Sequence, residues 1–120
     1  MPRFAILLHV TPPGFRQPTH WDLMLEDRGE LLTWALAEPP RAGLLITATQ
    51  LPNHRLAYLD YEGAVSDDRG NVTRVDSGDF VWLSRDATLA VAVLTGQHAT
   101  LRYELQPKAG TEWELRIADC

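Results

Sequence analysis

Cysteine is almost absent from this chain of 120 residues, since the only one is Cys120, the last residue. No disulfide can therefore form within the chain, and a domain of this length can be stable without one. The lack of disulfides fits a reducing compartment, so we expect the protein in the cytoplasm.

Long apolar runs are also missing, and no stretch approaches the roughly 20 residues of a membrane-spanning helix. The segment MPRFAILLHV holds a short apolar run, but His9 interrupts it and no small-residue cleavage site follows. We interpret this segment as a β-strand rather than a signal peptide, and we expect no membrane partner.

Basic residues are fewer than acidic ones, and the net charge is −5. Binding to nucleic acid normally requires a basic face, so the overall charge argues against an extensive interface of that kind. A local basic patch is still compatible with an acidic chain, and it would be supplied by Arg55, Arg69, Arg74 and Arg102.

Several catalytic and cofactor motifs are absent as well. The chain has no GxxxxGK[ST], no GxGxxG, no paired CxxC and no GxSxG. These absences argue against P-loop, dinucleotide-binding, zinc-ribbon and serine-hydrolase chemistry. Cys120 has no histidine near it in sequence, which argues against a thiol nucleophile.

Short apolar segments separated by turn residues fill the chain, and no window indicates a long helix. Apolar residues make up 45% and charged residues 22%, as in an ordinary packed domain. The spacing predicts one mainly β domain over residues 1–120, an antiparallel sandwich or barrel with at most short helices. A short turn is expected around Pro52–Tyr58, and Ser77-Gly78 is expected to be a turn. The predicted strands are Arg3–Val10, His20–Glu26, Leu31–Ala37, Leu44–Thr49, Asn71–Val75, Asp79–Ser84, Thr88–Leu94, Ala99–Gln106 and Glu112–Ile117.

The segment HWDLMLE, residues 20–26, is the most informative stretch. Side chains of a strand alternate between its faces, so His20 and Asp22 point to one side while the apolar residues between them point to the other. Two ligands at that spacing can reach one metal ion, and His9, at the end of the preceding strand, is the best third ligand. A two-histidine, one-carboxylate set also suits an iron oxygenase. Histidines with purely structural hydrogen bonds are the simpler alternative.

A second polar cluster follows Pro52, and we expect it on a loop. His54 could donate to a phosphate oxygen or act as a general acid, and Tyr58 could supply a hydroxyl donor. The alternative is a polar loop with one aromatic anchor. Three of the four tryptophans are flanked by apolar strand residues and are expected in the core rather than on a base-stacking surface: Trp34, Trp82 and Trp113.

The order of these signals resembles the 3′-phosphoesterase domain of bacterial DNA ligase D and its free-standing relatives. The resemblance extends over nearly the whole chain. The matching series is His9, His20-Trp21-Asp22, Leu25-Glu26, Gly29-x-Leu31, Thr33-Trp34-Ala35, His54-x-x-x-Tyr58, Tyr61-Glu62-Gly63, Leu94-Thr95-Gly96 and Trp113-x-Leu115-Arg116.

The resemblance implies a small β-barrel whose polar interior holds a divalent metal, typically manganese. The family's metal ligands map onto His9, His20 and Asp22, and its further histidine and tyrosine map onto His54 and Tyr58. The implied activity removes ribonucleotides and phosphates from 3′ ends of nucleic acid during repair. A nucleic-acid end is then the expected partner, together with DNA repair proteins.

The chain departs from the family pattern at three positions that are usually basic. These positions hold Met24, Glu38 and Ile46. The spacing from His9 to His20 is also longer than in the ligase-linked domains. Met24 is expected on the cavity face, and substitute cations would be Arg69 first, then Arg55 or Arg74. The alternative function is a non-catalytic relative that keeps the metal and binds a nucleic-acid end or a protein.

Overall fold

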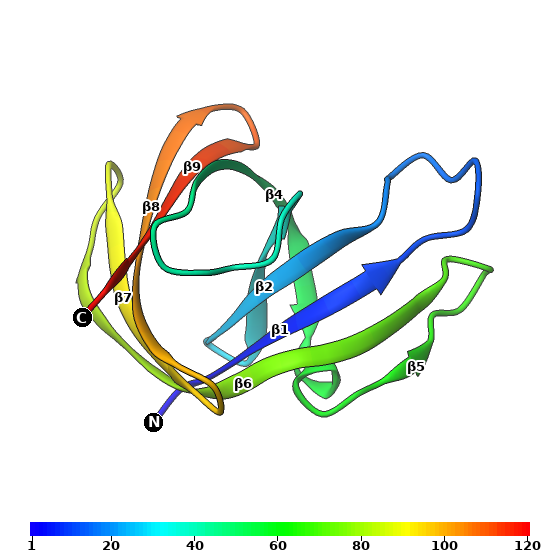
Figure 1. The fold of residues 1–120 in the computed structure, drawn as a ribbon, viewed down its shortest axis with the longest axis horizontal. Coiled ribbons are helices and arrows are strands. Elements are labelled where there is room, and N and C mark those ends of the chain that lie inside the picture. Colours follow the sequence, from blue (N-terminus) through cyan, green and yellow to red (C-terminus); the bar gives the residue numbers. More distant parts are fainter.

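The computed structural model describes residues 1–120 as one antiparallel sheet that closes into an eight-stranded barrel (Figure 1). The strand order is β1-β2-β3-β4-β9-β8-β7-β6, and β6 pairs with β1 to close it, while the short β5 extends the sheet beside β6. This architecture confirms the predicted fold class. The strands are β1 (Arg3–Val10), β2 (His20–Asp27), β3 (Glu30–Leu36), β4 (Leu45–Arg55), β5 (Gly63–Ala64), β6 (Asn71–Arg85), β7 (Ala90–Gly96), β8 (Thr100–Ala109) and β9 (Glu112–Asp119).

The only helix is a single 3-10 turn, η1 (Leu56–Leu59), which begins four residues later than the short turn expected around Pro52–Tyr58. It is neither long enough nor apolar enough to cross a membrane.

Strand β6 corrects one sequence-based expectation, because the turn predicted at Ser77-Gly78 does not exist. Figure 1 shows β6 as one long strand that runs beside β1 and continues to β7. Gly78 instead allows β6 to pack closely against β7, since a Cβ at this position would collide with the backbone oxygen of Thr95. Irregular register on both sides of Gly78 bends the strand so that it can pair with both neighbours.

Two apolar clusters lie on opposite faces of β1 and β2. The larger one fills the barrel and takes residues from all eight barrel strands, including Leu23 and Leu25. Trp34 is buried in it, and Trp82 and Trp113 pack against it, as predicted. The smaller cluster covers the other face and consists of Ala5, Leu7, Met24, Leu31, Leu59 and Val72. Because both faces are covered, β1 and β2 each contain four consecutive buried residues.

Strand β4 also differs from expectation, because it continues through Pro52 to Arg55 instead of ending before a loop. Leu51 pairs with Thr33 and His54 pairs with Leu31, so β4 contains one more residue than β3 between these pairs. This β-bulge explains how a proline, which cannot donate a backbone hydrogen bond, is tolerated in the strand. His54 is therefore positioned by a strand paired to β3 rather than by a loop.

Candidate metal centre

His9, His20 and Asp22 come together where β1 and β2 pair. His9 lies directly opposite His20, and Leu7 lies opposite Asp22. One ligand atom from each of the three side chains lies within 4.8 Å of the others. His9 Nδ1 is 3.8 Å from Asp22 Oδ2, and His20 Nε2 is 3.0 Å from Asp22 Oδ1. The three residues predicted as ligands therefore form one cluster.

Backbone carbonyl groups orient both imidazoles. His9 Nε2 donates a hydrogen bond to the oxygen of Arg69 at 2.6 Å, and His20 Nδ1 donates to the oxygen of Pro18 at 2.8 Å. Because a carbonyl oxygen can only accept, the hydrogen of each neutral ring lies on that nitrogen. The remaining nitrogens, His9 Nδ1 and His20 Nε2, keep lone pairs that face Asp22. Carbonyl contacts of this kind commonly orient metal-binding histidines.

Two polar atoms of the cluster are buried without a hydrogen-bond partner, His20 Nε2 and Asp22 Oδ1. Both are acceptors when His20 is neutral, so their approach to 3.0 Å is unfavourable unless a cation or a proton lies between them. Burial lowers the pKa of His20, but the Asp22 carboxylate and the Pro18 carbonyl outweigh it and raise that pKa overall. A divalent metal ion would satisfy both buried acceptors, and two imidazole nitrogens with one carboxylate are suitable ligands for it.

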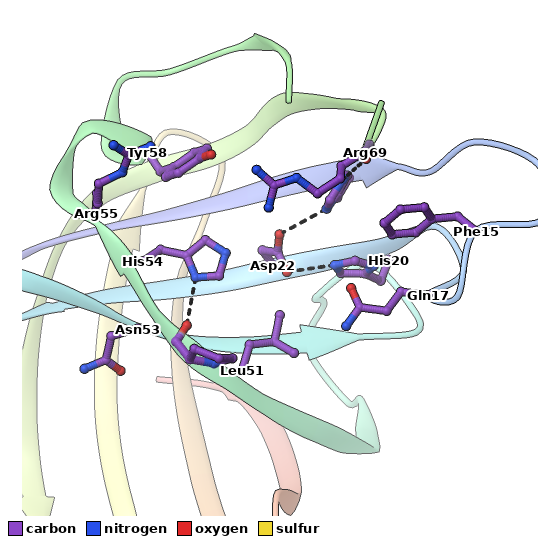
Figure 2. A pocket seen from close by; sticks show the side chains of 12 residues that line it. Phe15, Gln17, His20, Asp22, Leu51, Asn53, His54, Arg55, Tyr58 and Arg69 are labelled. Atoms are coloured by element: carbon purple, nitrogen blue, oxygen red, sulfur yellow. Dashed lines mark hydrogen bonds and ion pairs between the residues drawn. The ribbon is translucent and has the colours of Figure 1, made fainter. Parts of the chain in front are cut away.

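The cluster opens into a hollow of about 380 Å³ that His54 and Tyr58 also line. Figure 2 shows His54 beside Asp22, with Tyr58 and Arg55 at the end of the hollow away from His20. His54 Nδ1 donates to the oxygen of Pro52 at 2.9 Å, which leaves Nε2 free. The ring of Tyr58 stands edge-on to that of His54, with ring centres 5.6 Å apart.

Of the three arginines considered as substitute cations, two line this hollow, Arg55 and Arg69. The Arg69 guanidinium donates to the backbone oxygen and hydroxyl of Ser66, so those contacts leave its charge unneutralised. Arg74 does not line the hollow. Its guanidinium contacts Glu62 at 3.5 Å and the oxygen of Leu59 at 3.3 Å, which connects β6 to η1.

The three positions where the resemblance leads us to expect basic residues do not supply groups to the hollow. Met24 shares the face of Asp22, as predicted, but it is fully buried in the smaller apolar cluster and does not line the hollow. Ile46 packs against the barrel core on the other face. Glu38 forms an ion pair with Arg41 at 3.3 Å in the loop after β3.

The cluster does not lie in the barrel interior, where the resemblance implied it, because His20 and Asp22 face away from the core residues Leu23 and Leu25. Sequence reasoning also missed Phe15 and Gln17, which line the hollow from the loop between β1 and β2. The one available signal was that this loop joins two of the ligands. An adjoining hollow beyond His20 is uncharged apart from that histidine.

Fold and cluster together define a small antiparallel β-barrel domain with a histidine–carboxylate site on the outer face of its first hairpin. A sequence model of the DNA ligase D 3′-phosphoesterase domain matches residues 15–113, and the chain belongs to this family. Membership implies a phosphoesterase that processes 3′ ends. His9 precedes the matched residues, so its place in the cluster rests on the structure. No curated protein matches the chain.

Proposed function

We propose that the domain is a metal-dependent phosphoesterase that removes a 3′-ribonucleotide or a 3′-phosphate from nucleic acid. The observation that carries this proposal is the pair of unpartnered buried acceptors, His20 Nε2 and Asp22 Oδ1, in a cluster that shares its hollow with His54. A bound divalent ion, with manganese as the expected metal, would polarise a phosphoryl oxygen and activate a water molecule.

The chain's own residues then have distinct roles. His9, His20 and Asp22 hold the metal. Hydrolysis adds water to phosphorus and breaks the bond to the leaving oxygen, and that oxygen takes a proton from Nε2 of protonated His54. The Tyr58 hydroxyl donates a hydrogen bond to the phosphoryl group.

Arg55 and Arg69 bind the non-bridging oxygens of the phosphoryl group. Both arginines line the hollow and the neighbouring hollow beyond His20 has no arginine or lysine, so the anionic groups of the substrate lie on the Arg55–Arg69 side.

A second candidate is a non-catalytic relative that binds metal and a nucleic-acid end or a repair protein. One observation favours it: Met24 is buried and Glu38 is paired with Arg41, so neither position provides the cation that is usual in the family. Losing charge-assisted contacts to a phosphoryl group can abolish turnover while binding remains.

Turnover of a labelled oligonucleotide with a single 3′-terminal ribonucleotide, or with a 3′-phosphate, separates the two candidates. The phosphoesterase should give product with Mn²⁺ and none with EDTA. His54→Ala should lower turnover about 10²–10⁴-fold with little change in Mn²⁺ affinity. The control is His98→Ala, in the turn between β7 and β8. Metal-loaded wild type that yields no product would reject the enzyme and favour the binding module.

A further inference from the structure

A second hollow, of about 360 Å³, adjoins the first one and shares Arg55 and Tyr58 with it. It lies between η1 and the start of the β5–β6 hairpin, and its remaining lining includes Tyr61, Ala64, Val65 and Ser66. The metal cluster, His54 and Arg69 do not line this space.

The chemistry of this second hollow differs from that of the first. Five of its seven lining residues are hydrophobic, none is acidic, and Arg55 is the single charged one. The rings of Tyr58 and Tyr61 are almost perpendicular, at 83°, with centres 5.7 Å apart. Tyr61 is 38% exposed and its hydroxyl donates to the oxygen of Ala64, which anchors the ring. A fixed, accessible aromatic ring beside small side chains suits a flat, aromatic ligand.

The position of this hollow relative to His54 connects it with the reaction. Tyr58 lines both hollows and stands edge-on to His54. A group that leaves phosphorus beside His54 can therefore extend past Tyr58 towards Tyr61. Arg55 borders both hollows, so its guanidinium can contact a phosphate in one and the edge of a base in the other.

Building on the proposed function, we infer that the second hollow binds the base of the 3′-terminal nucleotide. The base stacks on Tyr61 while the phosphate that precedes this nucleotide occupies the first hollow. Stacking is available to every base, so this subsite selects a terminal nucleoside without selecting its sequence.

The test is binding, measured by fluorescence anisotropy in EDTA so that no cleavage occurs. The two probes are a labelled oligonucleotide with a 3′-terminal ribonucleotide and the same oligonucleotide ending in an abasic ribose. Both carry the same number of phosphates, so they differ only in the terminal base. Wild type should bind the abasic end about tenfold more weakly.

Variants test whether Tyr61 is responsible for the weaker binding of the abasic end. Tyr61→Ala should bind both ends equally, with the affinity that wild type has for the abasic end. Tyr61→Phe also loses the hydroxyl contact to Ala64 but keeps the ring, so it should still bind the end with a base more tightly. Leu83→Ala, at an exposed position on β6, is the surface control and should behave as wild type. Equal binding of both ends by wild type, or full discrimination by Tyr61→Ala, overturns the inference.

Turnover with Mn²⁺, measured on the same two oligonucleotides, separates this inference from the proposed function. Cleavage of both ends without any preference in binding would reject the base subsite and leave the phosphoesterase standing. Preference in binding without any cleavage would reject the phosphoesterase and retain the subsite.

Discussion

His9 donates its Nε2 hydrogen to the backbone carbonyl oxygen of Arg69, 60 positions later in the chain, across 2.6 Å. The contact depends on Gly70, whose φ of +95° lies in the left-handed region and whose missing Cβ would meet the carbonyl oxygen of Val10. The turn before β6 therefore lies directly against the end of β1. One residue serves two purposes, because the Arg69 backbone orients a metal ligand while its side chain borders the hollow.

Gly70→Ala should destabilise the protein and weaken metal binding. The left-handed backbone alone should cost about 1–3 kcal/mol of unfolding free energy, and moving the turn away from Val10 would break the contact to His9. Loss of such an orienting contact typically lowers metal affinity about 10–100-fold. Urea unfolding and Mn²⁺ titration measure the two effects.

Gly110→Ala is the matched control for this variant. Its φ is +58° but a Cβ there meets nothing within 4 Å, so the change should cost stability without altering metal affinity. The same loss of affinity in both variants would contradict the role given to Gly70.

Arg69→Ala should weaken the binding of single-stranded oligonucleotides and lower the slope of log K against log salt by about 0.7, the value for one phosphate contact. Metal affinity should stay close to that of wild type, because His9 contacts the backbone of Arg69 and not its side chain. Arg102→Ala, an exposed β8 position that pairs with Glu104, should leave the salt slope unchanged. An unchanged slope in Arg69→Ala would remove Arg69 from the substrate site.

Met24→Arg should destabilise the protein rather than restore a contact to phosphate. Met24 is fully buried in the smaller apolar cluster, so the arginine would be an unpaired buried charge, which costs about 3–5 kcal/mol. Met24→Leu keeps the volume and should change stability by less than about 1.5 kcal/mol. Urea unfolding compares the two variants. Near wild-type stability of Met24→Arg together with tighter oligonucleotide binding would show that this position does face the substrate.

The sequence was sufficient to predict the barrel and the convergence of the cluster. Alternation in β2 puts His20 and Asp22 on one face whatever the exact register, and the chain returns from His9 to His20 through one proline-rich loop. The apolar residues between the two ligands then define the opposite, core-facing side.

Other features depend on contacts between distant segments, which local patterns do not reveal. Gly78 resembles a turn residue, yet its small size allows β6 to pack against the backbone of β7. Met24 has the parity of a cavity residue, but it is buried in the smaller apolar cluster, to which η1 contributes Leu59. The β-bulge at Pro52 places His54 on a strand, although the proline itself favoured a loop.

The most direct test of the central claim compares Mn²⁺ binding by wild type and by Asp22→Asn. Titration with Mn²⁺ measures the affinity, and urea unfolding with and without the metal measures the gain in stability. Wild type should bind one ion per chain, and at a free metal concentration of 100 times Kd its unfolding free energy should rise by about 2.7 kcal/mol. Asp22→Asn should lose both effects yet be no less stable than wild type in EDTA, because the amide can donate to the unpartnered Nε2 of His20. Equal Mn²⁺ binding by the two proteins, or no binding by wild type, would contradict the assignment of His9, His20 and Asp22 as the metal centre.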